Sequence, residues 1–253
     1  ARMTLSQLRV PSIALGQRLD QGAMELTVTE RGLESAGTGR IGDIPARIAV
    51  ALDFAAGPPA QVTESVRVEA RAPAASLARF LPGLAALGPR GQADVALLME
   101  SRRNGRTDLA IRADLARAAL ALPALAWSKP AGRPTLVETV LRLQGGRLVG
   151  TELFRATAPD LALSGRLGFA AGGRLQRVEL AEARLFGTRA AGEVTAPARA
   201  GEPWRIALRG PVLDLAPVLA AERGEGEDGE GAALALEARF ERVLLGPQRV
   251  IHG

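Results

Sequence analysis

The chain has no cysteine and no tyrosine, and it contains a single histidine and a single lysine. Without cysteine, a disulfide framework, a thiolate zinc cluster and a thiol nucleophile are all excluded. The one histidine, His252, is the penultimate residue of the chain, where it cannot join the converging groups that a metal centre or a catalytic triad needs. We therefore expect a protein that is not an enzyme and that has no metal site and no cofactor.

Aromatic residues make up only 3% of the 253 residues, and the motifs G-x-S-x-G, G-x-x-x-x-G-K-[ST] and H-E-x-x-H are all missing. Carboxylates are plentiful, so residue types alone leave a glycosidase-type pair open. Most carboxylates alternate with apolar residues, however, which is typical of the solvated face of a strand. Sugar sites also rely on aromatic platforms, which favours the non-enzymatic interpretation.

Positive charge is spread thinly along the chain. The net charge is +5, and the longest basic cluster is "SRRNGR" at 101–106. Nucleic-acid binding needs a concentrated positive face, because several phosphates must be neutralised together. We therefore expect no nucleic-acid partner.

Long apolar runs are also missing, although apolar residues make up 47% of the chain. No run of 18 apolar residues could form a membrane span, and no signal peptide opens the chain. Both ends already have the pattern of a strand. We expect the chain to be an internal segment of a longer protein.

The pattern that dominates the chain is strict alternation of apolar and polar residues. In "IPARIAVALDF", the residues from Ile44 to Phe54 place every second side chain on one apolar face, and Arg47 and Asp53 on the other. The segments 23–30, 107–115 and 204–210 repeat this pattern. Successive side chains of a strand point to opposite faces, so the alternation predicts strands with one apolar and one wet face.

Glycine-rich turns such as "RNGR" (103–106) and "QGGR" (144–147) separate these segments. Asn-Gly and Gly-Gly supply the positive φ of tight hairpins. The predicted fold is all-β: an extended, curved antiparallel sheet forming an open β-groove of stacked repeats, with two short helices near 75–86 and 213–222.

The two helical segments divide the chain into a predicted first repeat at 1–88, a second at 89–223, and a final part at 224–253 that begins a further repeat. Repeats of this kind build extended bodies by stacking. The stretch "GEGEDGEG" (224–231) is acidic and glycine-rich. It lacks the ligand spacing of an EF-hand, so we favour a flexible loop over calcium binding.

The apolar face of the sheet is the main candidate site. If the sheet is open, this face lines a groove; if the sheet closes into a sandwich or barrel, it is core, and the pattern alone leaves both open. The candidate lining residues are Ile44, Ile48, Val50, Leu52, Phe54, Leu109, Ile111, Leu141, Leu163 and Ile206.

The stretch "LPALAWSKPAGRP" (122–134) contains the only lysine, Lys129, and one of two tryptophans, Trp127. Proline fixes φ and cannot donate to a ladder, so Pro130 and Pro134 indicate a rigid connector. We expect Trp127 to pin this connector to the sheet and Lys129 to face water. A binding role for the pair is the alternative.

Residues 109–219 resemble the AsmA-like family, in particular the domain of unknown function of YhdP-type envelope proteins. The resemblance rests on "LPALAWSKPAGRP" between two strands, on "LALSGRLGFAAGGRLQRVELAEARLFGTRAAGEV", and on the closing "LRGPVLDLAPVL". In the last of these, Ala216 stands where the family usually has serine. Residues 1–100 match more loosely, as a preceding repeat.

The resemblance implies a bridge-like lipid transport protein of a Gram-negative bacterium. Such proteins are anchored in the inner membrane by an N-terminal helix, which this chain lacks, and reach across the periplasm. The implied ligand is phospholipid, whose acyl chains would move along the apolar groove toward the outer membrane. The alternative is a closed β-sandwich that serves as a structural or interaction module of the envelope without lipid transport.

Overall fold

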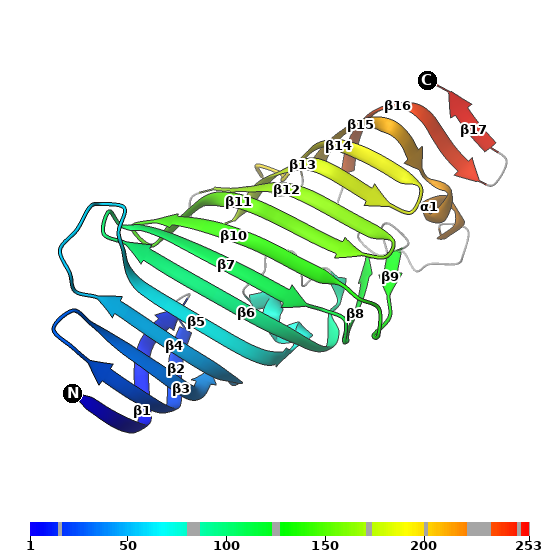
Figure 1. Ribbon diagram of the computed structural model, residues 1–253. Coiled ribbons are helices and arrows are strands. Elements are labelled where there is room, and N and C mark those ends of the chain that lie inside the picture. Colours follow the sequence, from blue (N-terminus) through cyan, green and yellow to red (C-terminus); the bar gives the residue numbers. More distant parts are fainter. Residues whose placement is uncertain are drawn as a thin grey trace.

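The computed structural model describes residues 1–14, 17–79, 87–122, 127–170, 174–199, 202–221, 234–246 and 249–252. These residues form a 17-stranded open sheet with one short 3-10 helix and one short α-helix (Figure 1). The prediction of an all-β, extended and curved antiparallel sheet is confirmed.

The strands follow one another along the chain with short connections. They are β1 (Arg2–Ala14), β2 (Gln17–Val28), β3 (Gly32–Ile41), β4 (Ile44–Asp53), β5 (Val62–Pro73), β6 (Arg90–Arg102), β7 (Arg106–Asp114), β8 (Ala118–Leu122), β9 (Trp127–Lys129), β10 (Leu136–Gln144), β11 (Arg147–Ala158), β12 (Leu161–Phe169), β13 (Leu175–Leu185), β14 (Thr188–Thr195), β15 (Trp204–Asp214), β16 (Leu234–Gly246) and β17 (Arg249–His252). The 3-10 helix η1 spans Ala74–Arg79, and the helix α1 spans Ala216–Ala221.

Most neighbours in the sheet are consecutive antiparallel strands. β1 to β7 pair in order, β10 then pairs directly with β7, and the order continues from β10 to β15. β8 and β9 leave this order as a hairpin, of which β8 pairs with the start of β6. β16 lies parallel to β15, because the chain crosses over between them through α1, and β17 pairs antiparallel with β16.

The register places residues of one kind on one face. Ile48 lies between Gly37 and Val68 on the neighbouring strands, whereas Arg47 lies between Thr38 and Glu69. Ile48 is 2% exposed, and Arg47 is exposed. We call the face of Ile48 the inner face and the face of Arg47 the outer face.

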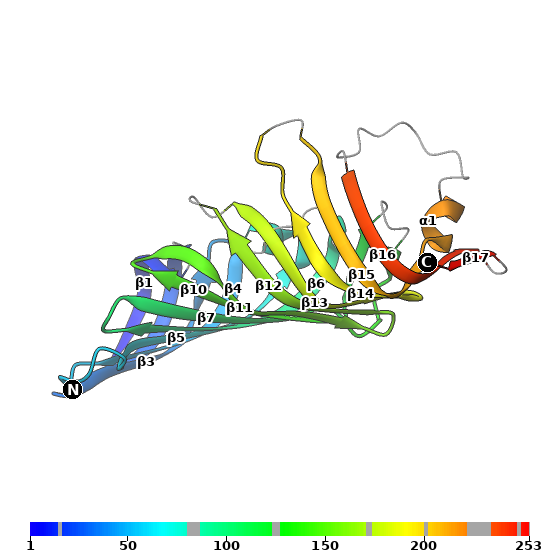
Figure 2. The same ribbon diagram turned by 90° about the horizontal axis from the view of Figure 1, so that it is seen from above.

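The strands bend, so the sheet is a curved band rather than a plane. In Figure 2 the strands from β12 to β16 rise out of a flat layer toward one side. A Cβ on Gly165 or Gly192 would lie 1.9 or 2.0 Å from the carbonyl oxygen of the next strand, so only glycine allows this approach. Both glycines belong to one row of register partners on the inner face: Phe154, Gly165, Leu180, Gly192, Leu208 and Ala238.

The predicted helices are present but shorter. In the first segment, η1 is a single 3-10 stretch, and residues 80–86 lie outside the described part of the chain. In the second segment, the predicted start at Leu213 is wrong, because Leu213 and Asp214 continue β15 and pair with Val243 and Leu244 of β16. α1 begins after Asp214, whose carboxylate accepts a hydrogen bond from the Ala216 amide at 3.0 Å.

The sheet continues without interruption through the boundary predicted between the first two repeats. β5 and β6 flank residues 88–89 and pair over most of their length. The acidic loop at 224–231 lies outside the described residues. The division into repeats stays a prediction.

Candidate functional site: an apolar face that is half covered and half open

The inner face carries the candidate site, and it differs between the two halves of the sheet. From β2 to β10 many of its side chains are buried: Ile48 is 2% and Leu109 is 1% exposed. From β12 to β16 most of them are half-buried or exposed, and Leu236 reaches 55%, although Val212 and Leu213 at the end of β15 are buried. The covering elements explain this difference.

The first cover is the far end of the β1–β2 hairpin. The ladder between the two strands is irregular after Leu5, and the hairpin end lies behind β3 to β5 in Figure 1. There its apolar side chains pack onto the inner face in one cluster with Ile48, Val66 and Val68. The side chains contributed by the hairpin end are Leu8, Val10, Ile13 and Leu19.

The second cover consists of η1 and the β8–β9 hairpin, over the other end of the same strands. Leu77 of η1 and Leu120 and Trp127 of the hairpin belong to one buried cluster with Ile44 and Ala113 of the sheet. Trp127 is 5% exposed and so lies in core. Pro130 and Pro134 follow at the surface and are exposed.

Lys129 is buried, so the expectation that it faces water is wrong. Its side chain is 1% exposed, and its Nζ donates to the backbone oxygen of Leu115 at 2.6 Å and to those of Ala116 and Ala118. These carbonyls belong to the turn between β7 and β8 and to the first residue of β8, which explains why the buried ammonium is tolerated. A buried ammonium needs oxygen acceptors, and a turn offers carbonyls that no ladder uses.

A third buried cluster needs no separate cover. Leu109, Ile111 and Leu141 pack with Leu143 and Leu148, which lie at the turn between β10 and β11. From β2 to β10 the described residues thus bury much of the inner face, whereas Val50 and Leu52 on β4 stay half-buried.

The open half presents a continuous apolar row across neighbouring strands. Its members are register partners: Leu167 of β12, Val178 of β13, Val194 of β14, Ile206 of β15 and Leu236 of β16. None of them belongs to a buried cluster formed by the described residues. We call these five residues the open row.

The predicted lining residues fall into three groups. Phe54 lies just beyond β4 and is 54% exposed, so it does not line the inner face in the middle of the sheet. Val50, Leu52, Leu163 and Ile206 are half-buried. The covered group is Ile44, Ile48, Leu109, Ile111 and Leu141. Four members of the open row were missed, although the alternation of their strands could have identified them.

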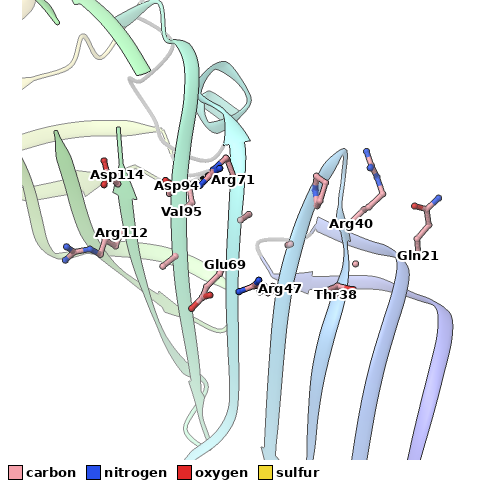
Figure 3. A pocket seen from close by; sticks show the side chains of 15 residues that line it. Gln21, Thr38, Arg40, Arg47, Glu69, Arg71, Asp94, Val95, Arg112 and Asp114 are labelled. Atoms are coloured by element: carbon pink, nitrogen blue, oxygen red, sulfur yellow. Dashed lines mark hydrogen bonds and ion pairs between the residues drawn. The ribbon is translucent and has the colours of Figure 1, made fainter. Parts of the chain in front are cut away.

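The outer face has a hollow of about 830 Å³ over β2 to β7 (Figure 3). Charges of both signs line it: Arg47 and Arg112 lie near Glu69 and Asp114. The hydrogen bond from Arg71, at 2.8 Å, together with Arg117 holds the pKa of Asp94 below its usual value. Mixed charge of this kind is typical of a solvated strand face, and it offers no concentrated positive surface.

Neither described helix has the length and hydropathy that a membrane span requires. Within the described ranges, histidine and carboxylate side chains form no group of three that could hold a metal ion. No family model, curated protein or solved structure matches the chain. The resemblance to the AsmA-like family therefore stays a prediction from the sequence.

Proposed function

We propose that the chain is a segment of a bridge-like lipid transport protein, in which the inner face holds the acyl chains of phospholipids. The observation that carries this proposal is the open row, an apolar strip that crosses five strands in register. The part of the chain that the structure describes leaves this strip uncovered by any buried cluster.

The chemistry of the strip suits an acyl chain. Removing each CH₂ group from water stabilises the complex by about 0.8 kcal/mol, so an acyl chain is stabilised along the whole length of the strip. Strands lie about 4.8 Å apart, so five strands give the strip a length of roughly 19 Å. The side chains are leucine, valine and isoleucine, which carry no polar group and would let the acyl chain slide.

The location follows the same proposal. A strip that runs across strands lengthens as strands are added, so a longer sheet of this kind would conduct lipid along its axis. We place the protein in the periplasm of a Gram-negative bacterium, anchored in the inner membrane by a helix outside this chain. Phospholipid would then move toward the outer membrane.

The proposal is tested by extracting lipid from the purified chain and quantifying it by mass spectrometry. We expect phospholipid in stoichiometric amount in the parent and in Thr195→Glu, and its loss in Val194→Glu. Thr195 is the matched control, because it is on the outer face of the same strand between Arg177 and Arg205. A parent without phospholipid, or a Val194→Glu variant that retains it, would overturn the proposal.

A structural module of the envelope is the second candidate. The burial of Ile48, Leu109 and Ile111 favours it for the N-terminal half, where the inner face is filled by protein. The closed β-sandwich form of this candidate is wrong for the described residues, since they form one open sheet and not two facing sheets. Lipid extraction also separates the two candidates.

A further inference from the structure

The bend in the β1–β2 hairpin has an unusual backbone on both strands. Gln7 of β1 has φ 56° and Gln21 of β2 has φ 53°, whereas nearly all other left-handed residues in the described chain are glycines. Left-handed backbone is unfavourable for a side chain with a Cβ, and a glutamine does not offset this through the local hydrogen bonds that asparagine makes. Strain of this kind is concentrated at switch regions and ligand clamps.

Gln7 and Gln21 lie at the same level of the hairpin. The register shifts on either side of the pair Leu8–Gly22, and Gln7 and Gln21 lie next to these two residues. A Cβ on Gly22 would lie 3.0 Å from the Cβ of Leu8, so the strands cross closely at this point. Both strands therefore turn at the same level, and we call the hairpin end beyond this point the arm.

The arm beyond the bend is amphipathic. Its apolar side chains face the sheet, where Leu19 is fully buried. Its charged side chains face water, and Arg18 pairs with Asp20 at 2.6 Å there. Toward β3 the arm is held by the register pairs Leu19–Ile41 and Asp20–Arg40. Opening the arm would break these pairs, the hydrogen bond from the Gly42 amide to the Arg18 carbonyl, and the apolar contacts of the arm.

The surface under the arm is of the same kind as the open row. It consists of Ile48, Val66 and Val68 with Leu97 and Met99 at its border, all on the inner face. The arm thus occupies an apolar surface of the kind that an acyl chain would bind.

We propose that residues 8–13 and 17–20 form a displaceable cover, hinged at Gln7 and Gln21, over a second acyl-chain site on the inner face of β4 to β6. This rests on the proposed function, because the ligand of the covered site is the same acyl chain. Closed, the cover fills this second site; open, it frees the site for an acyl chain, separately from the open row, because Leu109 and Leu141 are buried between the two. The strained hinge keeps the closed state from being too stable to open.

The test changes the hinge in two opposite directions. Valine tolerates left-handed backbone least, so Gln7→Val with Gln21→Val favours the open cover. Glycine removes the strain, so Gln7→Gly with Gln21→Gly favours the closed cover. The same two changes at Gln176, an exposed residue of β13 outside the left-handed region, are the control.

Opening is read from one engineered cysteine, because the chain has none of its own. Val68→Cys places a thiol under the cover, and Ile111→Cys places one in the adjacent cluster that the arm does not touch. We expect thiol labelling at position 68 to be roughly a hundredfold faster in the valine pair than in the glycine pair, as about tenfold for each of two left-handed residues implies. Labelling at 111 should be equal in both.

Lipid binding is measured in parallel with vesicles of phosphatidylethanolamine and phosphatidylglycerol that carry a radiolabelled acyl chain. We expect the valine pair to retain more labelled lipid than the glycine pair. Equal labelling at 68 in the two pairs, or equal changes at 68 and 111, would overturn the cover. If thiol labelling at position 68 differs between the two pairs but both retain the same amount of lipid, the hairpin end is a cover but does not cover a lipid site. No lipid on the parent or any variant would overturn the proposed function instead.

Discussion

At the scale of single residues, Lys129 holds the β8–β9 hairpin against the sheet. Its ammonium is removed from water and donates to carbonyls of the turn between β7 and β8. Burial lowers the pKa of Lys129; Asp114 opposes this effect, and Arg133 adds to it. The Leu115 and Ala116 carbonyls also accept hydrogen bonds from the Ala118 and Gly132 amides, so Lys129 adds a charged donor to a turn that the backbone already holds.

Lys129→Met should destabilise the chain by about 1–3 kcal/mol, because it keeps the apolar stem but removes the charged hydrogen bonds to the carbonyls of Leu115, Ala116 and Ala118. Urea unfolding at pH 7 measures this, with Arg147→Met at an exposed site as control. The pKa adds a second signature. Between the lowered folded value and the unfolded value of 10.5, the unfolded chain binds more protons, so the parent gains stability as pH rises there. The variant should lack this rise, and a variant as stable as the parent would contradict the assignment.

Trp127→Ala should cost about 3–5 kcal/mol of stability, since a large side chain leaves a cavity in the core under the β8–β9 hairpin. Its lipid content, normalised to folded protein, should equal that of the parent, because Trp127 lies in a buried cluster that includes no member of the open row. Thermal unfolding and lipid extraction give the two readings. Parent-like melting with loss of lipid would instead place Trp127 in a binding site.

At the scale of elements, the row of inner-face register partners that contains Gly165 and Gly192 sets the curvature of the open half. Large and small residues alternate along this row, so each leucine lies beside a glycine on the next strand. The ladder is irregular at the same level on β12, β13 and β14. Bulges bend strands and strengthen their twist, which together with the glycines turns the sheet into a curved band.

Gly192→Ala should destabilise the open half by about 1–3 kcal/mol, because the new Cβ would overlap the Ala207 carbonyl. Limited proteolysis should cut β14 and β15 faster than in the parent. Gly150→Ala is the matched control, since that glycine is also in a strand but has no heavy atom within 4 Å of a Cβ. If both variants resist proteolysis equally, the row tolerates a side chain at position 192.

The elements also show what the sequence could predict. Alternation identified the strands and faces correctly at 107–115, where Leu109 and Ile111 are buried and Arg112 is exposed. It could not predict the bend of the β1–β2 hairpin, because Gln7 and Gln21 carry no local signal for left-handed backbone. Alternation also cannot distinguish the buried part of the inner face from the open part, because it identifies which face is apolar and not what packs on that face. The burial of Lys129 depends on carbonyls from another turn, which no local pattern contains.

At the scale of the whole molecule, the two halves of the inner face should respond differently to charge. Ile48→Glu buries an unpaired carboxylate in a packed cluster, which costs several kcal/mol and should leave the chain unfolded. Ile206→Glu places the same group in the half-buried open row, so the chain should stay folded and lose phospholipid. Circular dichroism and lipid extraction measure both, with Arg205→Glu on the outer face as control. Unfolding of both inner-face variants would show that the open half is core as well.

The central claim is that acyl chains lie on the open row of the inner face. The most direct test loads the purified chain with a phospholipid carrying a photoactivatable group near the end of one acyl chain, then maps the cross-linked residues by peptide mass spectrometry. We predict cross-links at Leu167, Val178, Val194, Ile206 and Leu236, and none at their outer-face neighbours Arg166, Arg177 and Arg205. Cross-links spread equally over both faces, or confined to the outer face, would contradict the account.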